Sequence, residues 1–226
     1  MLDAHVVITA GGLGSRMGSE KPKQFLELNG LPVLMHSIKA FYQYSTNIKI
    51  IVTLPGMHLT AWEALCRDHH FEIPHTVCHG GETRFESVKH GLENVDEGLV
   101  AVHDAVRPLV SVELIARCFE AARDKGNAVP VIPLTDSVRE VLNGESRPAD
   151  RDHLRLLQTP QVFDAALLKS AYKQAFRPSF TDDANVAEAF GAKIILVEGD
   201  PRNIKITRPE DMLIAEALGP QRSADL

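Results

Sequence analysis

The sequence predicts an α/β domain built on a mostly parallel β-sheet, and three observations lead to that class. Short β-branched apolar runs recur along the chain, the first at residues 6–8. Stretches with helical spacing of apolar residues separate these runs, and glycine-rich or polar turns follow several of them. This alternation indicates parallel βαβ units with right-handed crossovers, in which ligands bind at the carboxyl ends of the strands. We expect a single domain over residues 1–226.

The individual elements follow from local patterns. A helix is expected at 34–44, because apolar residues recur at helical spacing after Pro32. A short extended piece with Lys205 turned away from its apolar neighbours is expected at 203–207. The remaining strands are predicted at 48–54, 75–78, 99–102, 128–133 and 193–198, and the remaining helices at 59–66, up to residue 92, 112–125, 165–176, 181–190 and 209–218.

A β-hairpin that leaves the main sheet is predicted in the second half of the chain. Residues 137–141 read as one extended run, Asn143-Gly144 is a strong hairpin turn signal, and a polar return piece runs on to residue 157. Such an excursion covers an active site or reaches a partner subunit. We expect an arm at about 135–157.

Composition sets limits on the class of protein. With 44% hydrophobic and 24% charged residues the chain is typical of a globular protein, and its net charge of -6 argues against nucleic acid as a partner. No run reaches the roughly 18 apolar residues of a membrane helix, and no signal segment is evident. We therefore expect a cytoplasmic protein without membrane contact. Cys66, Cys78 and Cys118 form no paired motif and are expected to be reduced.

The first strand leads into a cationic, glycine-rich turn, TAGGLGSRMGSEKPKQ at 9–24. Its glycines allow bare N–H groups to approach a ligand, and Arg16, Lys21 and Lys23 supply positive charge, a combination suited to a polyphosphate. A Walker A loop is excluded because Gly18 is followed by Ser19 rather than lysine. The dinucleotide fingerprint is broken at Met17, which weakens an oxidoreductase interpretation. A glycine-rich surface turn with solvated charges remains the alternative.

Two later strand ends carry further candidates. In GGETRFESV at 80–88, a glycine pair precedes a helix, so that Ser87 lies where a hydroxyl reaches a base or ribose; a simple helix cap is the alternative. Asp104 follows the strand at 99–102 and is a candidate ligand for Mg²⁺, unless it caps a helix or pairs with Arg107. His103 is interpreted as a packed or hydrogen-bonded residue rather than a base. Thr181 is expected to cap the helix that follows it.

The glycine turn followed by Lys-Pro-Lys resembles the signature of nucleotidyltransferases that join an NTP to a phosphorylated sugar or polyol. Over nearly the whole length, the chain is similar to the 2-C-methyl-D-erythritol 4-phosphate cytidylyltransferase family of non-mevalonate isoprenoid biosynthesis. Seven motifs carry the resemblance in order: AGGLGSRMG, KPKQFLEL, GGETRFESV, HDAVRP, QTPQVF, TDDA and NIKITRPED. The resemblance implies a Rossmann-like nucleotidyltransferase domain that uses CTP, a polyol phosphate and Mg²⁺ or another divalent cation.

The resemblance also implies roles for individual residues. Arg16 and Lys23 would meet the triphosphate and Lys205 the reacting phosphates, while Asp104 would lie near Mg²⁺ and the acceptor. The hairpin arm would embrace the second subunit of a homodimer. The implied nucleotide-binding residues are Ala10, Gly11, Gly12, Gly81, Glu82 and Ser87; the implied acceptor-binding residues are Asp104, Arg107, Thr159 and Thr181, with Ser137 and Arg151 serving the neighbouring subunit.

Two other functions stay open at this point. Gly11 also occurs in the related ribitol-5-phosphate cytidylyltransferases, which leaves ribitol 5-phosphate open as the acceptor; the last three motifs taken together favour methylerythritol phosphate. A non-catalytic nucleotide sensor would also need the binding loops. The grouping of Arg16, Lys23 and Lys205 with a carboxylate favours catalysis.

Overall fold

A computed structural model describes residues 3–12 and 21–219. Within these residues the predicted α/β class is confirmed, with a mixed sheet in the order β10-β7-β11-β6-β1-β4-β5 and β12 paired to β7. Helices cover both faces of this sheet. Its strands are β1 (Ala4–Thr9), β4 (Lys49–Leu54), β5 (Thr76–His79), β6 (Leu99–Asp104), β7 (Asn127–Pro133), β10 (Arg155–Leu157), β11 (Gln161–Asp164) and β12 (Leu196–Glu198).

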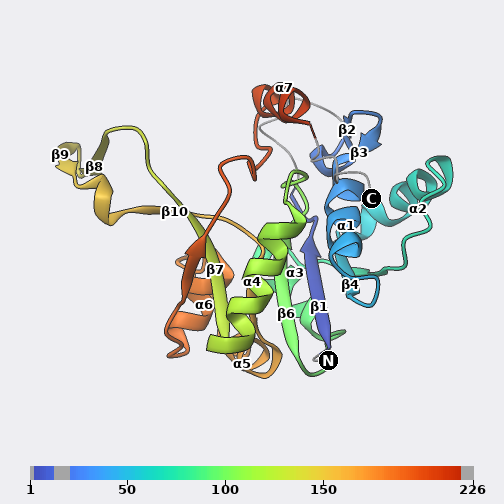
Figure 1. Ribbon diagram of the computed structural model, residues 1–226, viewed down its shortest axis with the longest axis horizontal. Helices are drawn as coiled ribbons and strands as arrows, with labels where there is room; N and C mark the ends of the chain where they lie inside the picture. Colours follow the sequence, from blue (N-terminus) through green and yellow to red (C-terminus); the bar gives the residue numbers. More distant parts are fainter. Residues whose placement is uncertain (1–2, 13–20, 220–226) are drawn as a thin grey trace.

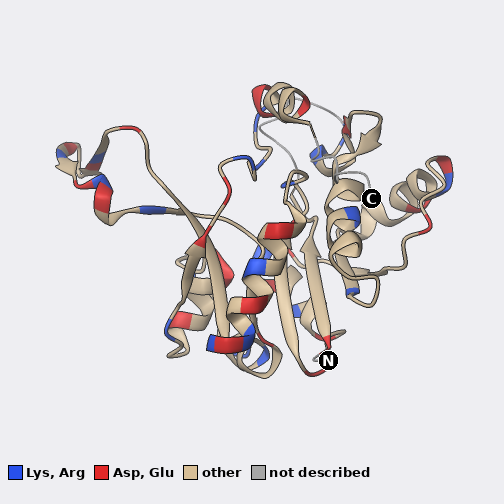
Figure 2. Cartoon of the chain, viewed as in Figure 1, with Lys and Arg blue, Asp and Glu red and all other residues tan. Residues whose placement is uncertain are grey.

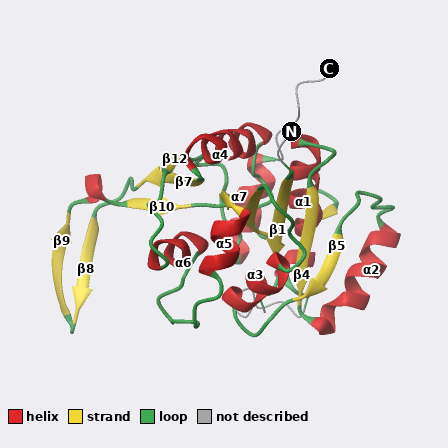
Figure 3. Cartoon of the chain, turned by 90° about the horizontal axis from the view of Figure 1, so that it is seen from below, coloured by secondary structure: helices red, strands yellow, loops and turns green. Residues whose placement is uncertain are grey.

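The helices form two layers against the sheet (Figure 3). Apolar residues alternate along β1, so that Val6 and Ile8 pack into one core and Val7 into the other. On the first face lie α1 (Val33–Tyr44), α2 (Leu59–Asp68) and α4 (Val112–Lys125). On the second face lie α3 (Arg84–Leu92), α5 (Ala165–Ala171) and α6 (Asp183–Ala189).

Smaller elements complete the chain. A short hairpin of β2 (Glu27–Leu28) and β3 (Leu31–Pro32) follows the 3₁₀ turn η2 (Lys23–Phe25). Two further 3₁₀ turns are η3 (Gly56–His58) and η4 (Arg151–His153), and α7 (Pro209–Leu218) ends the described chain. No helix in the described ranges has the length and apolar character that a bilayer crossing demands.

The main difference from the predicted topology is β11, where the sequence patterns predict no strand. It runs antiparallel to both β6 and β7 and lies between them. Its first three residues are buried, because both faces of the sheet are covered at this point. Four residues between Pro160 and a helix are too few for a recognisable alternation, so the neighbouring strands and not the local pattern define this element.

Three further expectations were wrong in detail. The helix expected at 165–176 ends at Ala171; Tyr172 is buried, and Lys173 and Phe176 beyond it are exposed. Thr181 does not cap α6; the Asp182 carboxylate does, accepting from the Asn185 backbone N–H at 2.8 Å. Thr181 instead accepts from the Asn185 side chain at 2.8 Å. The piece at 203–207 forms no strand, although Ile206 is buried while Lys205 is exposed, as the alternation predicted.

The hairpin predicted from Asn143-Gly144 is present as β8 (Val138–Leu142) and β9 (Glu145–Ala149). Both turn residues have positive φ, 50° for Asn143 and 83° for Gly144, which is the conformation that a two-residue hairpin turn requires. The hairpin lies apart from the sheet (Figure 1), and both signs of charge are spread over it and over the helices (Figure 2).

The carboxyl ends of the central strands bring the predicted site segments together. Thr9 at the end of β1 is in register with Asp104 at the end of β6. On the other side of β1, the Ala10 N–H donates to the Thr53 carbonyl at 3.0 Å, and the Gly80 N–H donates to the Leu54 carbonyl at 2.8 Å. The start of the first glycine turn, the Gly80-Gly81 turn and Asp104 therefore lie at one edge of the sheet.

Candidate active site

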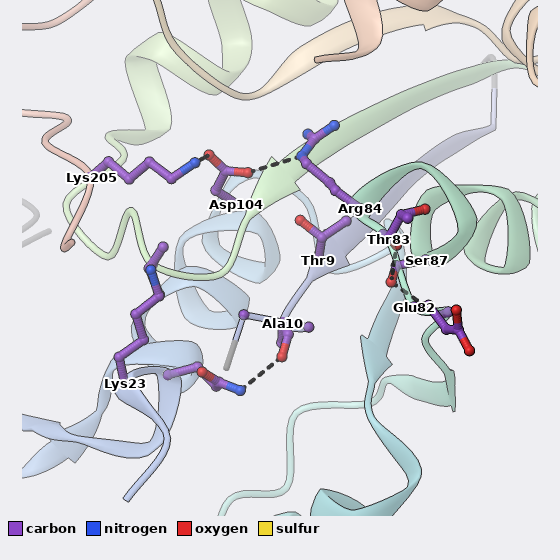
Figure 4. A pocket seen from close by; sticks show the side chains of 14 residues that line it. Thr9, Ala10, Lys23, Glu82, Thr83, Arg84, Ser87, Asp104 and Lys205 are labelled. Atoms are coloured by element: carbon purple, nitrogen blue, oxygen red, sulfur yellow. Dashed lines mark hydrogen bonds and ion pairs between the residues drawn. The ribbon is translucent and has the colours of Figure 1, made fainter. Parts of the chain in front are cut away.

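The sheet edge holds a cavity of about 190 Å³ between the two glycine turns. Figure 4 shows Lys205 and Arg84 reaching Asp104 from opposite sides, with Lys23 below. All six predicted nucleotide-binding residues line it, as do Lys23, Asp104 and Lys205. Arg16 lies outside the described residues. The predicted roles stay predictions, but their shared location is now defined.

The start of the first glycine turn is held by backbone contacts. Gln24 is buried and its Nε2 donates to the Ala10 carbonyl at 2.8 Å, which ties the Lys-Pro-Lys segment to the end of β1. A Cβ on Gly12 would meet Lys23 Cε at 3.3 Å. Lys23 thus lies against the start of the turn, where its Nζ donates to the Ile206 carbonyl at 3.3 Å.

The second turn is fixed by a capping box at the start of α3, formed between Thr83 and Glu86. Ser87 Oγ accepts from the Gly81 N–H at 3.1 Å and donates to the Thr83 carbonyl at 2.9 Å. A Cβ on Gly81 would come within 2.2 Å of Glu86 Cβ, so this close turn requires glycine. Ser87 thus shapes the cavity wall in addition to any contact with a nucleotide.

Three cations surround the buried carboxylate of Asp104. Lys205 Nζ lies 2.9 Å from Oδ2, Arg107 Nε lies 3.6 Å from Oδ2, and Arg84 Nε lies 3.4 Å from Oδ1. Burial raises the pKa of Asp104, but Arg84, Lys205 and Arg107 outweigh it and hold that pKa well below its usual range. Asp104 is therefore a carboxylate at neutral pH and aligns positive charge at the cavity floor.

This arrangement predicts how acid affects stability. Because the pKa of Asp104 is lowered on folding, its charge stabilises the protein above the unfolded-state pKa of about 3.9, and this contribution is lost as the pH falls below that value. We expect Asp104→Asn to lower the free energy of unfolding by about 3 kcal/mol at pH 7. The difference from the unaltered protein should shrink between about pH 4 and pH 2. Urea denaturation across this range measures it, and a gap independent of pH would contradict the prediction.

Arg84 is the site residue that the sequence patterns did not single out. Its Nη1 and Nη2 atoms contact the two carboxylate oxygens of Asp183 at 3.1 and 2.7 Å, and Tyr172 donates its hydroxyl to the same carboxylate at 2.6 Å. One signal was available in the sequence. A cation in the first turn of a helix opposes the helix dipole, so Arg84 needs acidic partners from elsewhere in the fold.

A second cavity of about 230 Å³ adjoins the first. Arg84, Asp104 and Lys205 line both cavities. Four predicted acceptor-binding residues, Asp104, Arg107, Thr159 and Thr181, line this second cavity. Ser137 and Arg151 do not; both are exposed beside or near the hairpin, where Arg151 Nη1 donates to the Thr135 carbonyl. Within this chain the structure brings together four of the six residues.

His103 is not placed as a base. It is fully buried, and burial lowers its pKa to about 3, so that the imidazole is neutral near pH 7. Its ring packs edge-on to Phe41 with centroids 5.1 Å apart. The prediction of a packed, hydrogen-bonded histidine is therefore confirmed.

The metal-ligating side chains near the cavities limit how a divalent cation could be held. Over the described ranges, no three His, Cys, Asp or Glu side chains form a group suited to a metal ion. Asp104 supplies one buried carboxylate to the shared wall of the cavities, and cations already face both of its oxygens. Mg²⁺ commonly takes one or two carboxylates together with substrate phosphates. A single carboxylate fits only an ion whose other ligands are substrate phosphates and water.

A glycine-rich turn after β1, converging lysines and an adjoining cationic cavity at the same sheet edge define a nucleotidyltransferase of the α/β type. A model of the 2-C-methyl-D-erythritol 4-phosphate cytidylyltransferase family matches residues 4–219. The chain belongs to this family.

Comparison with individual members of the family supports this assignment. The chain is 50% identical over 218 residues to the 2-C-methyl-D-erythritol 4-phosphate cytidylyltransferase of Phocaeicola vulgatus, covering 96% of this chain and 100% of that protein. It is 51% identical over 213 residues to the enzyme of the same name from Bacteroides fragilis, covering 94% and 97%. The crystal structure of the enzyme of that name from Thermus thermophilus matches with a TM-score of 0.78 and 34% identity, over 96% of this chain and 98% of that chain.

Proposed function

We propose that this protein transfers a cytidylyl group from CTP to 2-C-methyl-D-erythritol 4-phosphate, yielding the CDP-linked methylerythritol and pyrophosphate in non-mevalonate isoprenoid biosynthesis. The observation that carries the proposal is the shared wall of the two cavities. Arg84, Asp104 and Lys205 border both, so a nucleotide in one and an acceptor in the other meet at these side chains. Family membership supports the choice of substrates.

The nucleotide occupies the first cavity in this proposal. The Ala10, Gly11 and Gly12 backbone and Lys23 contact the triphosphate. Arg16, which lies outside the described residues, keeps the triphosphate role that the family resemblance implies. Gly81, Glu82 and Ser87 face the base and ribose from the opposite wall. The acceptor occupies the second cavity, beside Arg107, Thr159 and Thr181.

In the reaction, an oxygen of the acceptor phosphate attacks the α-phosphorus of CTP and the bond to the leaving pyrophosphate breaks. Both reactants are anions, so charge neutralisation and alignment are the main contributions of the protein. Lys205 is half exposed at the shared wall, where it can turn from Asp104 to the reacting phosphates. An acceptor phosphate is already ionised near neutral pH, so the reaction needs no protein base and no covalent intermediate.

A divalent cation such as Mg²⁺, bound with CTP, would be held by phosphate oxygens and Asp104, where it neutralises charge on the phosphates. The residues of this chain align the reactants around it. Arg84 and Arg107 keep Asp104 in place from two sides, so the carboxylate remains fixed when Lys205 moves to phosphate.

The hairpin arm is proposed to join two subunits into a homodimer and to complete each other's acceptor site. Two observations support this. Ser137 and Arg151 lie away from both cavities of their own chain, and large apolar side chains on and after the hairpin are exposed: Val141, Leu142, Leu154, Leu156 and Leu157. Apolar residues exposed in this number on an extended arm favour a partner surface.

Arg151→Ala is expected to raise the KM for the acceptor about tenfold or more, because a charged hydrogen bond to phosphate contributes roughly 1.5 to 3 kcal/mol. The KM for CTP should change little. Steady-state kinetics with each substrate varied gives both values. Arg147→Ala is the matched control, since Arg147 is exposed on β9 and pairs with Glu140 at 2.5 Å. A larger effect on CTP than on the acceptor would contradict the assignment.

Subunit mixing tests whether the site is shared. When equal amounts of Arg151→Ala and Lys23→Ala protein exchange subunits, each heterodimer regains one intact site, so about a quarter of full activity should return. Native mass spectrometry of the mixture establishes the dimer and its exchange, because the two variant subunits differ in mass and the heterodimer has an intermediate mass. No recovery despite exchange would show that Arg151 serves its own subunit.

The function itself is tested by incubating the protein with each NTP and Mg²⁺, offering either 2-C-methyl-D-erythritol 4-phosphate or ribitol 5-phosphate, and measuring pyrophosphate. The proposal predicts rapid release only with CTP and the methylerythritol acceptor. Faster pyrophosphate release with ribitol 5-phosphate would show that ribitol 5-phosphate is the acceptor. Nucleotide binding without pyrophosphate release would indicate a sensor.

A further inference from the structure

A closed ring of buried hydrogen bonds adjoins the shared wall of the two cavities, and two of its members, Arg107 and Thr159, also line the second cavity. Its members are His103, Arg107, Asn203 and Thr159, whose exposed fractions are 0%, 9%, 0% and 5%. They come from three segments that are far apart in sequence. These are the end of β6 with the turn that follows it, the turn before β11, and the stretch that carries Lys205.

The first half of the ring has a fixed direction. The Arg107 carbonyl can only accept, so His103 donates its Nε2–H to it at 3.2 Å. His103 Nδ1 then carries no proton and accepts the Thr159 hydroxyl at 3.1 Å. The same Thr159 oxygen accepts from the Asp104 backbone N–H at 3.1 Å. A single imidazole tautomer therefore orients the backbone on both sides of Asp104.

Asn203 closes the second half of the ring. Its side-chain Nδ2 donates to the Thr159 backbone carbonyl at 2.8 Å, and its backbone carbonyl accepts from Arg107 Nη1 at 2.7 Å. Lys205 follows two residues later, and the Ile206 N–H donates to the Val106 carbonyl at 2.8 Å. The position of the lysine backbone is thus tied to the turn that directly follows Asp104.

We propose that His103 and Asn203 are positioning residues that hold Asp104 and Lys205 in the geometry required for cytidylyl transfer. This inference rests on the proposed function. Neither side chain lines a cavity, so they act through the ring and not by touching substrate. A displacement of about 1 Å in a reacting group costs on the order of 100-fold in rate, so loosening the ring affects turnover before it affects binding.

The test compares variants that break the ring with variants that retain part of it. His103→Phe keeps a flat aromatic side chain but removes both side-chain hydrogen bonds of His103. His103→Gln keeps an amide that is able to donate to the Arg107 carbonyl. Asn203→Leu removes the hydrogen bond from Asn203 Nδ2 to the Thr159 carbonyl and leaves the backbone contact with Arg107 in place. We expect kcat to fall about tenfold or more for His103→Phe and Asn203→Leu, with the KM for CTP within about threefold and a smaller loss for His103→Gln.

His36→Phe is the matched control, because His36 is also buried and contacts the Leu28 carbonyl through Nε2 at 2.8 Å, yet belongs to neither cavity. Equal loss of kcat in this control would show that any buried histidine matters and would overturn the proposal. So would an unchanged kcat in His103→Phe, or equal losses in His103→Phe and His103→Gln. Thermal unfolding of each variant shows that the compared proteins are folded.

Nitrogen NMR of the unaltered protein tests the ring without any turnover. At pH 7 the His103 imidazole should carry its proton on Nε2, with Nδ1 bare. The opposite tautomer would overturn the ring as described even if the enzyme were active. If the ring tautomer is found but no NTP and acceptor pair releases pyrophosphate, the proposed function fails while the hydrogen-bond geometry stands.

Discussion

Replacing Lys205 by alanine is expected to slow pyrophosphate release by one to two powers of ten or more. A charged hydrogen bond to phosphate contributes roughly 1.5 to 3 kcal/mol, and every ~1.4 kcal/mol is a tenfold change in rate. Lys205 also neutralises Asp104, which it contacts at 2.9 Å, so its loss leaves more negative charge at the point where two anions approach. Initial rates at saturating CTP and acceptor measure the effect.

Lys89→Ala is the control for removing a lysine, because Lys89 is exposed on α3 and lines neither cavity. It should retain full activity. Lys23→Ala should lose activity on the same scale as Lys205→Ala, since both cations border the first cavity. Unchanged pyrophosphate release in either cavity variant would show that the assigned phosphate role is wrong.

The largest effect on stability is expected from Asp183→Asn. Asp183 is fully buried, receives both guanidinium nitrogens of Arg84 at 3.1 and 2.7 Å, and accepts the Tyr172 hydroxyl at 2.6 Å. Without the charge, the positive Arg84 is left beside the core with Asp104 as its remaining acid. Breaking one partner of a buried pair costs about 3 to 5 kcal/mol, a large share of the stability of a domain.

Urea denaturation followed by circular dichroism measures this loss. Asp164→Asn is a suitable control, because Asp164 is an exposed N-cap of α5 and asparagine caps a helix equally well. Its free energy of unfolding should change by a few tenths of a kcal/mol at most. A similar small change in Asp183→Asn would mean that the pair with Arg84 contributes little to the fold.

The sequence predicted well those elements whose ends are marked by capping or turn residues within the element's own stretch of sequence. The bounds of α4 match the prediction at both ends, because Ser111 caps it and Gly126 ends it with a φ of 86°. The hairpin turn at Asn143-Gly144 was predictable for the same reason. Elements that depend on partners distant in sequence were not predictable. Strand β11 forms because it pairs with both β6 and β7, and no short window of sequence reveals that pairing.

The candidate site also has a part that the sequence predicts and a part that depends on contacts between distant segments. Both glycine turns and Asp104 were predictable as neighbours, because parallel strands bring their carboxyl ends to one edge. The pairing of Arg84 with Asp183 spans 99 residues, and the link from Asn203 to Thr159 spans 44. Nothing in a local pattern fixes such contacts, so the network that orients the predicted residues emerges only from the folded chain.

The central claim is that an acceptor phosphate in the second cavity attacks CTP in the first. The most direct measurement is a single turnover with CTP and 2-C-methyl-D-erythritol 4-phosphate carrying ¹⁸O in its nonbridging phosphate oxygens, with products analysed by mass spectrometry. We predict a CDP-linked methylerythritol that retains all the label, and unlabelled pyrophosphate. Label in the pyrophosphate, or hydrolysis of CTP without the linked product, would contradict the account.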